Sequence, residues 1–279
     1  MQARQAQTKR RTEVIGIASG KGGVGKTTMS SNLAVALSMM GKQVMLLDAD
    51  LGLANAQIAL GCQTQYNLSH VIAGEKSLKE VIVTSRQGVK LVPGASGVHQ
   101  MAAISAPVTA GIVQAFSELD DEIDYLIVDT AAGIAPSVLA FMEACQRRFI
   151  VVKDEPSSIA DAYGIIKVMT RDLELDEIYL IPNMVDSQAA GAQLYRRVNE
   201  VCDRFLGKTL QYLTSIETDE LVLSALKKYQ SVMEFAPGSA GARDFRRLAD
   251  AITNLPEISH VSGGLQFFME RLVKRNPGG

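Results

Sequence analysis

The glycine-rich segment at residues 20–27, GKGGVGKT, constrains the fold of this chain most strongly. It fits the pattern G-x-x-x-x-G-K-[ST], which requires a β-strand before it and a helix after it. A β-branched run at Val14–Ala18 precedes the segment, and a helical pattern at Thr27–Met40 begins in it. Backbone N–H groups of such a loop turn toward phosphate oxygens, and the helix N-terminus adds a partial positive charge. The segment therefore predicts a site for a nucleoside triphosphate and Mg²⁺.

The chemistry of this motif assigns roles to individual residues. Lys26 is expected to reach the β- and γ-phosphates, and the Thr27 hydroxyl is expected to bind Mg²⁺. The residues expected to contact the nucleotide are Gly22, Gly23, Val24, Gly25, Lys26, Thr27 and Thr28.

Carboxylates follow two further strand patterns. Asp48 and Asp50 come after Val44–Leu47, and Asp129 comes directly after Tyr125–Val128. Parallel sheets bind ligands at the carboxyl ends of their strands, so all three carboxylates should face the nucleotide. A single acid after a buried strand has the Walker B form, and we expect Asp129 to hold Mg²⁺. The alternative is that these aspartates serve only the turns in which they lie.

Short β-branched runs alternate with longer helical patterns along the whole chain, which predicts a mostly parallel sheet covered by helices on both faces. The predicted strands are Val14–Ala18, Val44–Leu47, Val89–Val92, Tyr125–Val128, Phe149–Val152, Ile178–Ile181 and Leu210–Leu213. The predicted helices are Thr27–Met40, Val108–Leu119, Pro136–Cys145, Ser157–Arg171, Ser187–Leu206, Thr218–Lys228 and Ala240–Thr253. We expect a single α/β domain at residues 13–262, a flexible basic arm at 1–12, and an amphipathic helix and tail at 263–279.

Composition excludes several classes of protein. With 279 residues, 47% of them apolar, and a net charge of −2, the chain is neither disordered nor a global polycation. Its three cysteines form no CxxC pair, which argues for reduced thiols and a cytoplasmic protein. No apolar run is long enough for a transmembrane helix, so we expect any membrane contact to be peripheral.

A second lysine at the start of the loop, Lys21, departs from an ordinary P-loop. A loop of this form resembles that of the MinD/ParA branch of P-loop ATPases, in which the early lysine reaches across a dimer interface to the partner's nucleotide. Such a cation stabilises the charge that develops during phosphoryl transfer. The resemblance implies an ATP-bound homodimer that hydrolyses ATP slowly with Mg²⁺. The alternative is that Lys21 is a solvated loop residue.

The resemblance continues at residues 48–55, DADLGLAN, which match the first switch region of MinD-type proteins. It implies that Asp50 positions or activates the attacking water and that Asp48 supports the Mg²⁺ shell.

Two later residues take roles from the same resemblance. Glu155 matches an acid that faces the partner subunit, which implies an intersubunit ion pair with Lys21. The alternative is that this segment only starts a helix at Pro156, with Ser157 or Asp154 near the cap. Asn183 matches an amide that reads the base, and its donor and acceptor suit adenine. We therefore expect ATP as the cofactor, together with Mg²⁺. Residues 216–218, IET, depart from the Ile-Pro usual at that place in the family.

The segment Leu265–Arg275 forms a basic amphipathic pattern at helical spacing. Its apolar arc, the expected membrane face, consists of Leu265, Phe268, Met269, Leu272 and Val273. Phe267 falls outside this arc. A reversible membrane anchor and a terminal helix docked on its own domain are both consistent with the pattern.

Within the family, the chain most resembles the flagellar-number regulators FlhG and FleN, through VMLLDADLGLAN, DTAAGI and DEPSSIADAYGIIK. This resemblance implies control of flagellar gene transcription through an activator of the FleQ type, joint action with a GTPase of the FlhF type, and a place at the membrane near the cell pole. The start lacks the DQAxxLR-like segment with which many members activate that GTPase.

Three other functions remain open at the level of sequence. One is a MinD/ParA-type positioning ATPase for the division site, chemoreceptors or chromosomes. Another is an electron-transferring relative, which would need cluster-ligating cysteines. The third is an ATP-dependent ligase or kinase. Because no concentrated basic face is visible, we expect no direct binding of nucleic acid.

Overall fold

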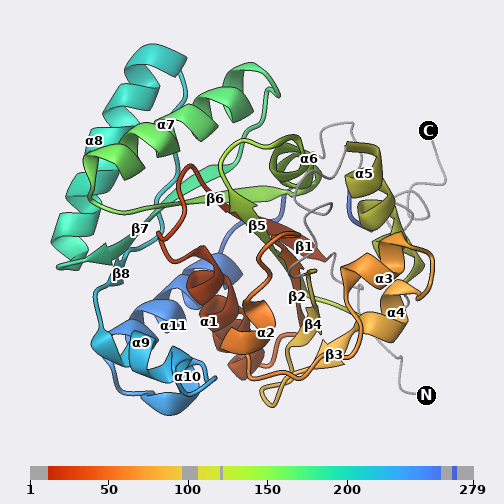
Figure 1. The fold of residues 1–279 in the computed structure, drawn as a ribbon. Helices are drawn as coiled ribbons and strands as arrows, with labels where there is room; N and C mark the ends of the chain where they lie inside the picture. Colours follow the sequence, from red (N-terminus) through yellow and green to blue (C-terminus); the bar gives the residue numbers. More distant parts are fainter. Residues whose placement is uncertain (1–11, 96–105, 120–121, 259–265, 269–279) are drawn as a thin grey trace, which may run out of the picture.

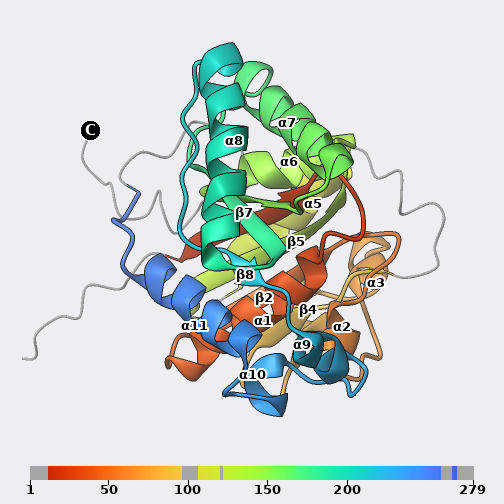
Figure 2. The ribbon, with the colours of Figure 1, turned by 90° about the vertical axis from the view of Figure 1, so that its left-hand side faces the viewer.

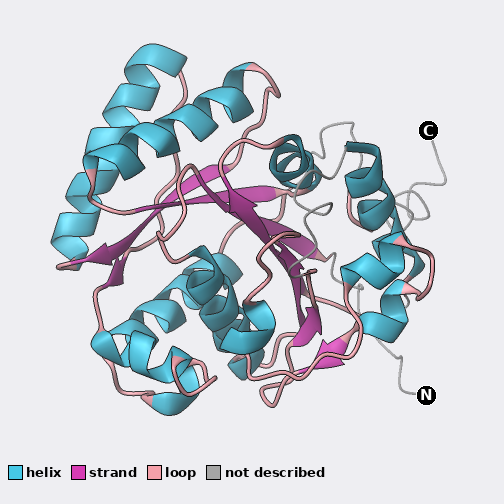
Figure 3. Cartoon of the chain, in the orientation of Figure 1, coloured by secondary structure: helices cyan, strands magenta, loops and turns pink. Residues whose placement is uncertain are grey.

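The computed structural model describes residues 12–95, 106–119, 122–258 and 266–268. Its centre is an eight-stranded sheet (Figure 1). The strands are β1 Glu13–Ser19, β2 Val44–Ala49, β3 Val83–Thr84, β4 Lys90–Val92, β5 Tyr125–Ala132, β6 Arg147–Val152, β7 Ile178–Val185 and β8 Ile216–Glu217. The strands form one layer between the helices (Figure 3).

The strand order places the candidate site at the middle of the sheet. The order is β3-β4-β2-β5-β1-β6-β7-β8, and all neighbours are parallel except β3 and β4. The chain crosses from β1 to β2 on one side and later places β6 on the other side of β1. Open α/β sheets bind ligands at such a switch point, beside the carboxyl ends of the central strands.

Helices cover both faces of the sheet (Figure 2). They are α1 Lys26–Met39, α2 Ala56–Ala59, α3 Leu68–Ile72, α4 Leu78–Val81, α5 Ala106–Ala115, α6 Pro136–Ala144, α7 Pro156–Arg171, α8 Gln188–Leu206, α9 Glu220–Leu226, α10 Val232–Phe235 and α11 Ala240–Thr253, with a 3₁₀ turn, η2, at Phe116–Glu118. Helices α1, α10 and α11 pack on one face. Helices α5, α6, α7 and α8 pack on the other.

The central strands are apolar on both sides because both faces are covered. In β5, Leu126 and Val128 belong to one hydrophobic cluster and Tyr125 and Ile127 to another on the opposite face. A strand of this kind shows a continuous apolar run rather than alternation. The predicted α/β fold, with a mostly parallel sheet in one domain, is therefore confirmed.

One predicted strand, Leu210–Leu213, was wrong. The segment makes only an isolated bridge between Gln211 and Tyr179, and the next strand is Ile216–Glu217. Its Leu210 donates its N–H to Asn199 Oδ1 and accepts a hydrogen bond from the Tyr195 hydroxyl, both residues of α8. Gln211 exchanges two backbone hydrogen bonds with β7, through Ile178 and Leu180, and the pairing does not continue beyond it.

The end of the chain differs from the predicted amphipathic helix where the structure describes it. Phe267 and Phe268 are 2% and 3% exposed, and both rings pack edge-on against Phe116 of η2. Phe268 has a φ of 59°, so residues 266–268 form a turn rather than a helix. Phe268, expected on a membrane face, is thus buried on its own domain.

The other residues of the expected membrane face, Leu265, Met269, Leu272 and Val273, lie outside the described residues, as do residues 1–11 of the basic arm. Among the described residues, no helix combines the length and apolar character needed to cross a bilayer.

Candidate nucleotide site

The phosphate loop joins the end of β1 to the start of α1. Gly25, the residue before α1, has a φ of 90°, which favours glycine. A Cβ atom at Gly25 would lie 2.5 Å from Nδ2 of Asn183. Gly23 also has a positive φ, and no heavy atom lies within 4 Å of the place its Cβ would take. The loop therefore has the conformation and the open side that a phosphate group requires.

Lys26 extends from the first turn of α1 into the site. Its Nζ donates to Ser19 Oγ at 2.8 Å, and Ser19 is fully buried on β1. Burial lowers the pKa of Lys26, and the carboxylates of Asp129 and Asp50 act against this lowering. A half-buried ammonium beside a glycine loop is stabilised by an anionic ligand, which fits the expected phosphate contact.

Asp129 is fully buried within β5, opposite Asp48 of β2 in the ladder. Its Oδ1 accepts a hydrogen bond from Ser30 Oγ at 3.0 Å. Its Oδ2 is buried without a hydrogen-bond partner in the described part of the chain. Burial raises the pKa of Asp129 to about 6, while the Thr27 hydroxyl, the Lys26 ammonium and the Ser30 hydroxyl act in the opposite direction. A free buried carboxylate oxygen beside the Thr27 hydroxyl is a donor set that suits Mg²⁺.

Asp48 organises the segment that follows β2. Its Oδ2 accepts from the backbone N–H groups of Asn55 and Ala56, each at 2.9 Å, and its Oδ1 accepts from Asp50 N–H at 3.2 Å. Burial and the neighbouring Asp129 raise the pKa of Asp48 to about 7. In this structure the side chain of Asp48 therefore holds the backbone of the β2–α2 loop in place. It does so beside the residues expected to bind Mg²⁺.

Asp50 lies in the same loop. Its Oδ1 accepts from the N–H groups of Gly52 and Leu53, at 3.4 and 3.1 Å, which makes a local turn. Its charge reaches Lys26 and Asp129. The structure thus places Asp50 at the site, while its Oδ1 is used for hydrogen bonds within the turn that Asp50 begins.

Lys21 and Glu155 meet within one chain, whereas the resemblance implied a pair between subunits. Lys21 Nζ lies 3.4 Å from Glu155 Oε2 and 2.9 Å from Ser157 Oγ. Lys153 Nζ lies 2.7 Å from the other oxygen, Oε1. The short distance along the surface from the phosphate loop to the start of α7 makes this internal pair possible.

Asn183 is also placed at the loop. Its Nδ2 donates to the carbonyl of Val24 at 2.7 Å, and the next residue, Met184, has a φ of 55° and is 42% exposed. The amide expected to read adenine therefore holds the phosphate loop in this structure.

The sequence did not single out Ser19, Ser30 or Lys153, and it offered Ser157 only as a helix cap. A serine carries no pattern that separates a site residue from a surface residue. For Ser30 alone a signal exists, because it follows Lys26 by four residues on a helix and must share its face.

Comparison with known proteins identifies the family. The ParA family model, described as NUBPL iron-transfer P-loop NTPase, matches residues 10–253. The chain belongs to the ParA family of P-loop NTPases. Among curated relatives, it is 44% identical over 262 residues to the antiactivator FleN of Pseudomonas aeruginosa, covering 94% of each chain. It is 34% identical to the flagellum site-determining protein YlxH of Helicobacter pylori, over 95% of this chain and 91% of that one.

A solved relative supports the geometry. The septum site-determining protein MinD from Pyrococcus horikoshii, complexed with Mg-ADP, superposes with a TM-score of 0.74 at 26% identity, over 88% of this chain and 97% of that one. Nucleotide binding is thus a property of a close structural relative as well as of the family.

The cysteines of this chain offer little to a thiolate cluster. Burial raises the pKa of Cys145 to about 12 and that of Cys202 to about 11, so their thiolates are disfavoured. Cys62 is half-buried, and burial also raises its pKa. The iron-transfer chemistry in the family description therefore lacks an obvious ligand set among these residues.

Proposed function

We propose that this protein is an ATP-dependent switch, which dimerises around two ATP molecules and hydrolyses them slowly with Mg²⁺. The observation that carries this proposal is the different placement of two lysines on one phosphate loop. Lys26 is half-buried, and its ammonium donates to Ser19 inside the site of its own subunit. Lys21 lies at the rim, 41% exposed. A cation at the rim is available to the triphosphate of a second copy.

Each residue of the site has a separate role in this proposal. Lys26 binds the β- and γ-phosphates, while Thr27 and Asp129 hold Mg²⁺, with Asp48 supporting the metal's shell. The bound Mg²⁺ supplies charge stabilisation during phosphoryl transfer. Asp50 orients the attacking water once its turn opens. Lys21 from the other subunit stabilises the developing charge.

The dimer has a regulatory role in this proposal. High identity over nearly the whole length of an antiactivator supports control of flagellar number, in which the ATP-bound dimer binds a transcriptional activator of the FleQ type. The protein is then cytoplasmic, with reversible association with the inner membrane near the cell pole. A GTPase of the FlhF type is a further partner to test.

Three variants test the switch. Lys21→Ala and Lys26→Ala should abolish the ATP-dependent dimer in analytical ultracentrifugation, whereas Asp50→Ala should bind ATP and remain dimeric. A dimer that survives Lys21→Ala would refute delivery of the lysine in trans. The Asp50→Ala form with ATP is also the bait for capturing the activator from a cell extract, with Lys26→Ala as the matched negative control.

A positioning ATPase is the second candidate, supported by the fold shared with MinD. The two functions differ in cells. Loss of an antiactivator changes the number of flagella per cell, while loss of a division-site ATPase displaces septa. Counting both in a deletion strain separates the candidates, and a gel-shift titration at several salt concentrations tests chromosome cargo.

A further inference from the structure

The ammonium of Lys21 has two partners on its own subunit, and both lie at the start of α7. The shorter bond is to the neutral hydroxyl of Ser157, at 2.9 Å, and the longer is to the carboxylate of Glu155, at 3.4 Å. The loop itself also packs on α7, because a Cβ at Gly20 would meet the carbonyl of Asp161. The rim of the phosphate loop is therefore attached to α7 by a side chain and by its backbone.

Glu155 does not depend on Lys21. Its other oxygen pairs with Lys153 at 2.7 Å, and Lys153 contributes more than Lys21 to lowering the pKa of Glu155. The Glu155 carboxylate therefore stays paired with Lys153 when Lys21 moves away. Ser157 has Lys21 as its only side-chain partner in the part of the chain that the structure describes. The contact that is specific to Lys21 is therefore the one with Ser157.

The strength of these contacts suits a bond that forms and breaks. The side chains of Lys21 and Glu155 are 41% and 43% exposed, and solvent screens such pairs. Exposed contacts of this kind shift an equilibrium by about two- to fivefold. They are strong enough to place a lysine and weak enough to release it.

We propose that Ser157 is a positioning residue for Lys21, which holds its ammonium on its own subunit and must release it before Lys21 can reach the triphosphate of a second copy. The inference rests on the proposed ATP-dependent dimer. The bond between Lys21 and Ser157 exists in the separate subunit and is broken in the dimer. It therefore stabilises the separate subunit relative to the dimer and opposes dimerisation by its own free energy. Ser157 thus raises the protein concentration at which the active dimer forms.

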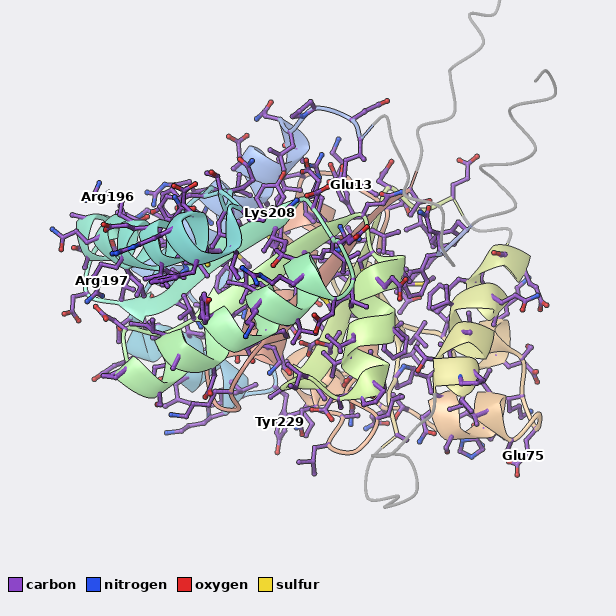
Figure 4. The ribbon with its side chains drawn as sticks, turned by 90° about the horizontal axis from the view of Figure 1, so that it is seen from above. Glu13, Glu75, Arg196, Arg197, Lys208 and Tyr229 are labelled. Carbon is purple, nitrogen blue, oxygen red and sulfur yellow. The ribbon has the colours of Figure 1, made fainter. Side chains whose placement is uncertain are left out.

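The test compares Ser157→Ala with the wild type, Ser157→Thr and Arg197→Ala. Arg197 lies on the outer side of α8 (Figure 4) and pairs with Asp154, so its replacement breaks an ion pair of the same loop without touching Lys21. Sedimentation with Mg²⁺ and a non-hydrolysable ATP analogue gives the dimerisation constant. ATP hydrolysis measured against protein concentration gives the half-maximal concentration and the rate per subunit at saturation.

We expect Ser157→Ala to dimerise at an about two- to fivefold lower concentration, with an unchanged rate at saturation. Ser157→Thr, which keeps the hydroxyl, should restore the wild-type threshold, and Arg197→Ala should not change it. An unchanged threshold in Ser157→Ala, or a weaker dimer, overturns the positioning role. If the wild type stays monomeric with the analogue, the proposed switch itself is wrong. The wild-type sample alone shows this, so the two failures can be told apart.

Discussion

Replacing Asp129 by asparagine is expected to stabilise the nucleotide-free protein while removing its Mg²⁺ binding. Asp129 is fully buried opposite Asp48, and its Oδ2 lacks a partner among the described residues. Burial raises its pKa from 3.8 to about 6, which corresponds to roughly 3 kcal/mol of unfavourable charge at about 1.4 kcal/mol per pH unit. The amide keeps an oxygen for Ser30 but adds N–H groups that need acceptors. We therefore expect a net gain of about 1–3 kcal/mol above pH 7.

The pH dependence of this effect has a definite sign. The folded carboxyl binds its proton more tightly than the unfolded one, so the folded state binds more protons between the two pKa values. The free energy of unfolding of the wild type should therefore fall as pH rises from 3.8 through about 6, and Asp48, with its pKa raised to about 7, extends the fall. Asp129→Asn should lose less stability over the same range.

Urea unfolding at pH 5 and pH 8 without nucleotide measures this difference, with Asp172→Asn, an exposed residue at the end of α7, as the control. Mg-ADP should then stabilise the wild type and leave Asp129→Asn unchanged. If Asp129→Asn is less stable than the wild type at pH 8, the buried charge is not a cost, and the reasoning is wrong.

Three further predictions concern the phosphate loop, a buried arginine and the end of the chain. Gly25→Ala should abolish ADP binding by calorimetry, because φ is 90° and Asn183 fills the space; retained affinity would contradict this. Arg147→Ala should cost about 3–5 kcal/mol in urea unfolding, because the buried guanidinium binds Glu13 and Tyr179; Arg197→Ala, which breaks only an exposed pair, should cost less than about 1 kcal/mol. Phe267→Ala should increase co-sedimentation with anionic liposomes by loosening the chain end from Phe116, and deletion of residues 265–279 should abolish it; equal values for both would leave the segment purely structural.

The fold was predictable because the apolar runs and helical patterns that indicate it are long and recur along the chain. The buried runs at Val14–Ala18 and Tyr125–Val128 each precede a motif and fit only a parallel sheet. The short helices α2, α3, α4 and α10 were missed because four or five residues are too few to show a helical period. The two-residue strand β3 was missed for the same reason.

The candidate site was predictable at the level of residues but not of bonds. Two sequence features identify the site residues: the spacing of GKGGVGKT and the aspartates that follow strands. The structure brings these residues together around Lys26. Which atom binds which depends on loop geometry that no pattern encodes. Asp48 therefore binds the backbone of its own loop, and Lys21 reaches Ser157 rather than only Glu155.

The bond from Asn183 to the Val24 carbonyl joins the residue proposed to read the base to the loop proposed to hold the phosphates. It occupies one of the two N–H groups of the amide, so the second N–H and Oδ1 stay available to a purine. The amide can therefore hold a base and the Val24 carbonyl at the same time. A base held in this way would be connected to the phosphate loop through one side chain.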